Sequence, residues 1–200
     1  MTKKDLSLLL LTPIISCLFT QAQAAPPVID QQALPADPIP FTYALGGPTS
    51  RQVLYQSLTV GLSGRLAELR LPIGCESGEV IVEIFNADPS GLPVAGESPR
   101  LTRRFRADLF PEMVFVDFQA LPLGGRVGVT AGEQIVIVLS NPTGSCGVAA
   151  GVPGDGYMDG TGHADDTTDP FPPVALNISP GGADDLPFQT LVRLMGPPAP

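Results

Sequence analysis

The chain has 200 residues, 44% of them hydrophobic, and a formal net charge of −9 at pH 7. A chain of this length and apolar content can bury the core of one domain. Its acidic balance argues against nucleic acid and anionic membrane surfaces as partners, because both require clustered positive charge.

The first 24 residues have the organisation of a secretory signal peptide. Lys3 and Lys4 precede an apolar segment over residues 6–19, and Ala22-Gln23-Ala24 supplies the small residues of a cleavage site. The apolar segment is shorter than a helix that spans a bilayer. We therefore expect export to the periplasm or the extracellular space, removal of residues 1–24 and no membrane span.

A lipoprotein signal is the alternative interpretation of this region. Ile14-Ile15-Ser16-Cys17 resembles a bacterial lipobox, in which Cys17 would be lipidated. The residues that follow Cys17 are still apolar, whereas a lipoprotein normally becomes polar there, so cleavage after Ala24 is favoured. The mature chain then carries nine arginines, no lysine and 19 acidic residues.

Residues 25–50 are rich in proline, and few apolar residues recur in them with any period. This pattern predicts an extended or disordered leader, in which Phe41-Thr42-Tyr43 pairs at the edge of a sheet. We expect the folded domain to cover residues 51–194 and to be followed by a proline-rich tail at residues 195–200.

From residue 51 onward, short apolar runs alternate with clusters of glycine and proline, which indicates many strands joined by turns. In residues 65–71, Ala67, Leu69 and Leu71 alternate with charged residues, as in a strand with one solvated face. Strands are predicted at residues 53–60, 65–71, 79–85, 101–105, 113–118, 126–129, 134–139, 146–150 and 189–194.

The run at residues 134–139, Gln-Ile-Val-Ile-Val-Leu, is continuously apolar after its first residue and rich in β-branched side chains. It predicts a central strand buried on both faces. No segment shows a sustained helical stripe. We therefore expect an all-β fold in which about eight antiparallel strands form a two-sheet jelly roll or β-sandwich.

The order of several segments resembles a family of bacterial extracellular jelly-roll domains related to galactose-binding-like β-sandwiches. The resemblance spans about residues 51–194 and rests on residues 56–60, 63–66, 80–84, 91–93, 114–118, 129–140 and 185–190. Its motifs are mostly structural. It implies a jelly-roll fold and a role as a non-catalytic module of an exported or cell-surface protein.

Cys75 and Cys146 are the only cysteines that remain once residues 1–24 are removed. An even number of cysteines in an exported protein predicts a disulfide bond. Two cysteines supply half of a zinc site, and no positioned base accompanies either thiol. For these reasons we favour a disulfide over a metal site or a cysteine nucleophile.

Residues 152–170 form an acidic, glycine-rich segment. Carboxylates on such a loop can wrap calcium, which accepts six to eight oxygen ligands in irregular geometry. The spacing fits no EF-hand, and a solvated acidic loop that keeps the protein soluble is the alternative. The calcium hypothesis assigns the ligand roles to Asp155, Asp159, Asp165 and Asp166.

The same segment carries Tyr157 and His163, which we expect to contact a ligand because long loops of β-sandwiches often carry recognition. No nucleophile signature accompanies His163, so no catalytic residue is predicted. The function expected is an exported, non-catalytic binding or surface-associated module for a glycan, calcium or a surface protein. The alternatives are a secreted polysaccharide hydrolase or lyase that uses acidic residues, and a structural component of an envelope or matrix assembly.

Overall fold

The computed structural model describes residues 25–37, 39, 42–46, 52–151, 157–166, 174–176 and 185–195. Across these residues the chain forms thirteen β-strands and one short 3₁₀ helix, Ala107–Leu109. The prediction of an all-β protein is confirmed, although the strands outnumber the eight expected. Within the same ranges, no helix is long and apolar enough to cross a membrane. The predicted signal peptide, with Cys17, lies outside them, as do residues 196–200.

The largest sheet has six strands, each antiparallel to its neighbours. Its order is β12-β11-β3-β9-β6-β7, with β12 at Val174–Ala175, β11 at Gly162–Asp166, β3 at Gln52–Thr59, β9 at Gln134–Ser140, β6 at Glu79–Asn86 and β7 at Leu101–Arg106. The arginines of residues 103–106 therefore lie on an edge strand, and Arg104 pairs there with Glu79 at 2.9 Å.

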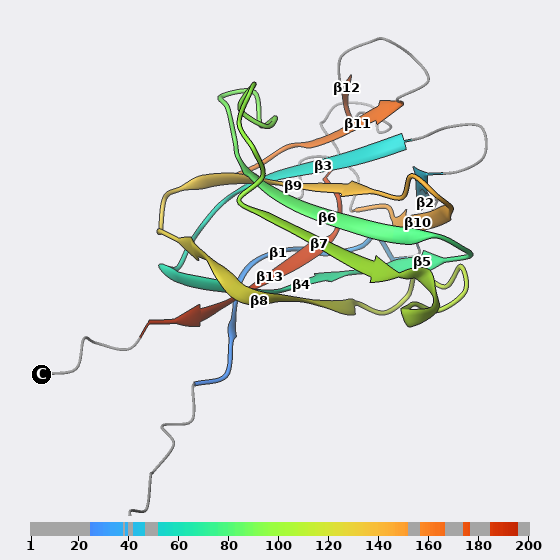
Figure 1. Ribbon diagram of the computed structural model, residues 1–200, viewed down its shortest axis with the longest axis horizontal. Coiled ribbons are helices and arrows are strands. Elements are labelled where there is room, and N and C mark those ends of the chain that lie inside the picture. The colour runs from blue at the N-terminus through green and yellow to red at the C-terminus, as the bar shows by residue number, and fades with distance from the viewer. Residues whose placement is uncertain are drawn as a thin grey trace, which may run out of the picture.

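Two smaller antiparallel sheets complete the fold. The four-stranded sheet has the order β1-β13-β4-β8, with β1 at Val28–Ala33, β13 at Phe188–Leu194, β4 at Gly64–Leu71 and β8 at Gln119–Val129. The three-stranded sheet has the order β2-β10-β5, with β2 at Thr42–Gly46, β10 at Ser145–Ala149 and β5 at Ile73–Cys75. The six-stranded sheet lies over the four-stranded sheet, and β5 continues from β4 to bring the third sheet to one end (Figure 1).

Strand β9 lies inside the six-stranded sheet, between β3 and β6. All five residues from 135 to 139 are buried, as the continuous apolar run predicts. Ile135, Ile137 and Leu139 point into the core between the sheets, while Val136 and Val138 are buried on the other face. The prediction of a central strand covered on both faces is therefore confirmed.

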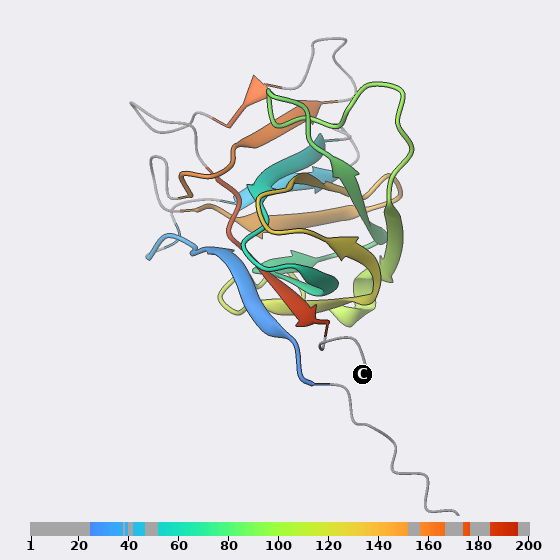
Figure 2. The ribbon, with the colours of Figure 1, turned by 90° about the vertical axis from the view of Figure 1, so that its left-hand side faces the viewer.

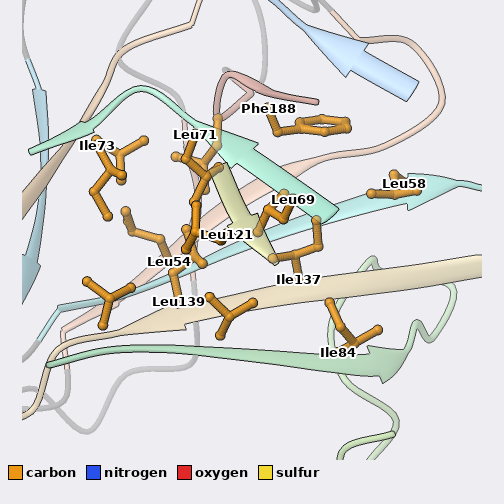
Figure 3. Packing of buried hydrophobic residues seen from close by; sticks show 14 of the residues in the cluster. Leu54, Leu58, Leu69, Leu71, Ile73, Ile84, Leu121, Ile137, Leu139 and Phe188 are labelled. Atoms are coloured by element: carbon orange, nitrogen blue, oxygen red, sulfur yellow. The ribbon is translucent and has the colours of Figure 1, made fainter. Parts of the chain in front are cut away.

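The hydrophobic core fills the space between the six-stranded and four-stranded sheets. Leu54, Ile84 and Ile137 extend from the first sheet, and Leu69, Leu121 and Phe188 from the second, in the cluster shown in Figure 3. These six side chains have relative exposures of 1% or less. Burial of each Leu, Ile or Phe side chain contributes about 1.5–3 kcal/mol, so this layer dominates the stability of the fold.

The N-terminal leader is part of the sheets. Strand β1 pairs with β13 and lies along it in Figure 2, and β2 pairs with β10. Within β2, Tyr43 and Leu45 are buried in the core. The expected pairing of the 41–43 segment is seen at Thr42 and Tyr43, while the folded body begins well before residue 51.

Residues 113–118 do not form the strand that their apolar alternation predicts. They cross the outer face of the three-stranded sheet, where the Phe115 ring would lie 2.9 Å from a Cβ placed on Gly147. Because Gly147 has no side chain, the ring packs directly on β10. The next strand along the chain is β8, Gln119–Val129, which includes the segment predicted as a short strand at residues 126–129.

The expected disulfide joins Cys75 to Cys146. The two cysteines face each other directly across the β5–β10 pair, and both are buried. Asn141 lies beside this bond, since its Nδ2 donates to Cys146 Sγ at 3.1 Å and to the Ser77 carbonyl at 2.9 Å. The disulfide thus joins two neighbouring strands of the three-stranded sheet, and the Asn141 hydrogen bonds tie the loop that follows β9 to them.

Candidate functional site

The acidic segment at residues 152–170 contains a strand rather than a continuous loop. Strand β11 pairs with β3, which places His163 opposite Tyr55 and Asp165 opposite Val53. This pairing turns the side chains of His163 and Asp165 towards the outer face of the six-stranded sheet, because Ala164 between them packs in the core. Among the described residues of this segment, the turn before β11 is the part that lines a pocket.

A polar pocket of about 270 Å³ lies on that outer face. It is lined by residues 57–59 of β3, the turn at 88–91, Gln134 at the start of β9, and the turn at 158–161. The connection between β6 and β7, which contains the 88–91 turn, rises beside β3 and β11 in Figures 1 and 2. We call this hollow the polar pocket.

The turn at residues 88–91 forms one wall of the polar pocket, and a single carboxylate holds its conformation. Asp88 Oδ1 accepts hydrogen bonds from Ser90 N at 2.8 Å, Ser90 Oγ at 2.6 Å and Leu92 N at 3.1 Å. These bonds, led by the one from the Ser90 hydroxyl, hold the pKa of Asp88 below its ordinary value. Asp88 is therefore ionised at neutral pH, and within the described chain its Oδ2 accepts no hydrogen bond.

The 158–161 wall is fastened to β3 by hydrogen bonds and by close packing. Thr59 Oγ1 donates to the Asp159 carbonyl at 3.2 Å, and Thr161 N donates to Ser57 Oγ at 2.8 Å. A Cβ on Gly160 would lie only 2.0 Å from the Ser57 carbonyl oxygen, so only glycine lets the turn approach this closely. Both walls are thus positioned before any ligand arrives.

Tyr157, expected to contact a ligand, is instead buried at the base of this wall. Its ring packs edge-on against Phe188 with the centroids 5.2 Å apart, and its hydroxyl lies 3.1 Å from Gln31 Oε1 and 3.3 Å from the Thr59 carbonyl. Burial raises the pKa of Tyr157 to about 12. The residue therefore links β1, β3 and β13, and it presents no exposed face to a ligand.

His163, the second residue expected to contact a ligand, is also buried, with 7% relative exposure. Its Cε1 lies 3.6 Å from the position that a Cβ on Gly91 would take, so the 88–91 turn covers it. Its Nδ1 is buried and has no hydrogen-bond partner among the residues that the structure describes. Burial is the main reason why the pKa of His163 falls below its ordinary value, and the Asp88 carboxylate opposes this shift.

This lowered pKa predicts a loss of stability in mild acid. The unfolded chain takes up a proton on histidine near the ordinary value of 6.5, whereas folded His163 does so only at lower pH. The unfolded state therefore binds more protons, and the free energy of unfolding falls as the pH drops below about 6.5. Urea denaturation at pH 7.5, 6.0 and 5.0 measures this fall. His163→Gln should flatten it, and an equal fall in that variant would contradict the assignment.

The calcium ligands predicted from the sequence do not gather in the part of the chain that the structure describes. Asp159 lies in the turn at the polar pocket, whereas Asp165 lies on β11 opposite Val53. Asp166 ends β11 opposite Gln52, and Asp155 lies outside the described residues. Across those residues, no three His, Cys, Asp or Glu side chains are grouped for a metal ion.

A second hollow, of about 430 Å³, lies next to the disulfide and is more open to solvent than the polar pocket. Its basic group is already paired, because Arg106 Nη2 donates to Asp108 Oδ2 at 2.5 Å. Phe110 and Ala107 add apolar surface to its lining. The polar pocket is therefore the stronger candidate site.

Sequence reasoning missed Asp88 and Gln134 as site residues. Asp88 stands in a turn-rich stretch, which signals a tight turn but not a pocket. Comparison with known proteins found no matching family and no matching curated protein. The fold and the pocket define the class: a disulfide-linked, sandwich-like all-β protein with a polar pocket on the outer face of its largest sheet.

Proposed function

We propose that the protein is an exported, non-catalytic binding or cell-surface-associated module with a jelly-roll fold, and that it recognises its ligand at the polar pocket. The observation that carries this proposal is the pocket itself, whose two walls are held by internal hydrogen bonds. Turns fixed on a rigid sheet are the usual place for recognition in β-proteins, because the sheet supplies stability and the turns supply specificity.

Export is supported by the N-terminal sequence and by the disulfide. A charged start, an apolar segment and a small-residue cleavage motif fit a secretory signal peptide. The bond between Cys75 and Cys146 fits an oxidising compartment, where disulfides form and persist. The resemblance to extracellular jelly-roll modules leads to the same proposal for the periplasm or the cell exterior.

The absence of catalysis is proposed from the state of the Ser57 hydroxyl, which lines the polar pocket. Ser57 is buried, accepts a hydrogen bond from Thr161 N and donates one to the Thr161 carbonyl at 3.3 Å. A serine nucleophile instead needs an exposed hydroxyl that donates to a base. We therefore assign Ser57 and His163 to the support of the two walls, and binding to the side chains that face the pocket.

The test measures binding of the labelled mature protein to a glycan array and to intact bacterial cells. Met158 is 86% exposed at the rim of the pocket, so Met158→Arg leaves the core unchanged and places a cation beside Asp88 and Asp159. We expect this variant to lose at least ten-fold in signal. Met113→Arg is the matched control, since Met113 is 45% exposed on the segment over the three-stranded sheet.

Equal signals from Met158→Arg and the unmodified protein would contradict recognition at the polar pocket. Loss in Met113→Arg alone would move recognition to the apolar segment at residues 113–116. Turnover of a polysaccharide panel would favour the hydrolase alternative. Concentration-dependent self-association in light scattering, without binding to any glycan or cell, would favour a structural component of an assembly.

A further inference from the structure

Three of the four hydroxyl groups that line the polar pocket donate their hydrogens to the protein. Ser90 Oγ donates to Asp88 Oδ1 at 2.6 Å, Thr59 Oγ1 to the Asp159 carbonyl at 3.2 Å, and Ser57 Oγ to the Thr161 carbonyl at 3.3 Å. A hydroxyl has only one hydrogen to donate, so these three groups can offer a ligand only their lone pairs. The pocket is therefore rich in acceptors, and among its lining side chains Thr161 and Gln134 are the ones that keep a hydrogen to donate.

The charge of the polar pocket also favours a ligand that donates hydrogen bonds. Asp88 and Asp159 line the pocket, and its lining contains no lysine, arginine or histidine. Asp88 is held in its ionised form by the hydrogen bonds of its turn, and its Oδ2 is left to accept from a ligand. An anionic ligand would meet like charge without a compensating cation in the pocket lining, which disfavours binding.

The size of the polar pocket and the residues at its rim restrict the class of ligand further. A volume of about 270 Å³ lies just below the roughly 300–1,000 Å³ usual for drug-sized ligands, so the pocket fits one small polar ring. Met158 and Pro89 supply apolar surface at this site, and the Gln134 amide can both donate and accept. A pyranose ring matches this combination, since it carries several O–H donors around an apolar C–H face.

We infer that the polar pocket binds a single sugar residue that carries no negative charge, with Asp88 Oδ2 accepting from its hydroxyl groups. This inference rests on the proposed function, because it names the ligand class of the same site. A neutral sugar supplies O–H donors to the acceptors of the pocket, and an amino sugar adds a favourable positive charge. A uronic acid brings a carboxylate into an acceptor-rich pocket and is rejected.

The experiment titrates the disulfide-intact mature protein, labelled with ¹⁵N, with methyl galactoside, methyl glucoside, methyl glucosaminide and methyl glucuronide. We expect saturable shifts of the amide signals of Ser90, Gly91, Gly160 and Thr161 with at least one neutral glycoside or the glucosaminide. The glucuronide should bind at least ten-fold more weakly than its neutral counterpart.

Asp88→Asn is the decisive variant. Asn keeps an Oδ1 acceptor for Ser90 and Leu92 but replaces Oδ2 with an amide donor, so the turn survives while the ligand loses its acceptor. We expect at least a ten-fold loss of affinity for the neutral glycosides. Asp117→Asn, a change of the same charge on the segment after residue 113, should leave the affinity unchanged.

The outcomes separate this inference from the proposed function. Equal binding of glucuronide and glucoside, or full affinity in Asp88→Asn, would overturn the inference. The proposed function would still stand if Met158→Arg abolished glycan or cell binding. No signal on any array or cell surface, together with no amide shifts, would overturn both. Glucuronide rejected by the unmodified protein but accepted by Asp88→Asn would support the charge argument directly.

Discussion

The double variant Cys75→Ala/Cys146→Ala should unfold with a free energy lower by about 4 kcal/mol than that of the oxidised protein. The disulfide joins residues 71 positions apart, so its removal allows the unfolded chain many more conformations. Guanidinium denaturation of both proteins at pH 7.5 measures the difference. Changing both residues avoids leaving a free thiol that could form bonds between molecules.

The unmodified protein in excess reductant provides the control for this experiment. It should unfold at the midpoint of the double variant, because both lack the same covalent link. Far-UV circular dichroism in the absence of denaturant should show β-structure in all three samples. If the oxidised and reduced proteins share one midpoint, the bond contributes nothing to stability and the entropic argument fails.

The strands that sequence patterns located are those with strong local signals. Strand β9 is recognisable because five consecutive apolar residues, most of them β-branched, are bounded by a Gly-Glu turn and Asn141-Pro142. The disulfide follows from the number of cysteines in an exported chain. Both features depend on residues that are close in sequence or few in number, so they can be predicted without knowledge of the fold.

Strands β1 and β11 lack such local signals, and their pairing partners are distant in sequence. Strand β1 pairs Val28 with Val192, and among its six residues only Ala33 is fully buried, so no apolar alternation marks it. At residues 113–118 the sequence pattern predicted a strand that the structure does not contain. Their alternation is real, but Phe115 packs on Gly147 instead of joining a ladder, which depends on a glycine more than 30 residues away.

The site was only partly predictable for the same reason. The sequence placed recognition near residues 152–170, and Asp159 of that segment does line the polar pocket. The opposite wall comes from the 88–91 turn, which only the pairing of β3, β6 and β9 brings close. Tyr157 appeared exposed because glycine and aspartate surround it, whereas its burial results from contact with Phe188, far along the chain.

A buried polar cluster joins this site to the rest of the fold. Asp185 has 3% relative exposure, and its carboxylate accepts hydrogen bonds from Gln56 Nε2 and Tyr157 N, both at 2.9 Å. Gln56 Oε1 in turn accepts from Leu186 N at 2.7 Å. Two side chains thus tie together β3, the turn before β11 and the segment that leads into β13.

Asp185→Ala should lower the free energy of unfolding by about 3–5 kcal/mol. The change leaves Tyr157 N buried without an acceptor and leaves Gln56 Nε2 with the Ser57 carbonyl as its one remaining acceptor, and each lost partner costs roughly 1–3 kcal/mol. Urea denaturation measures the loss, and Gln189→Ala is the control. Gln189 contacts Gln32 in an exposed pair, so its removal should change stability by less than about 0.5 kcal/mol.

A double-mutant cycle with Gln56→Ala separates this cluster from general packing. Gln56 and Asp185 bond to each other, so the loss in the double variant should be smaller than the sum of the single losses. Strict additivity would show that the two side chains act independently.

Because Asp185 fixes the backbone at Tyr157, Asp185→Ala should also weaken binding at the polar pocket, measured at a temperature where the variant is folded. Undiminished binding would show that the 158–161 wall is held by its contacts with Ser57 and Thr59 alone.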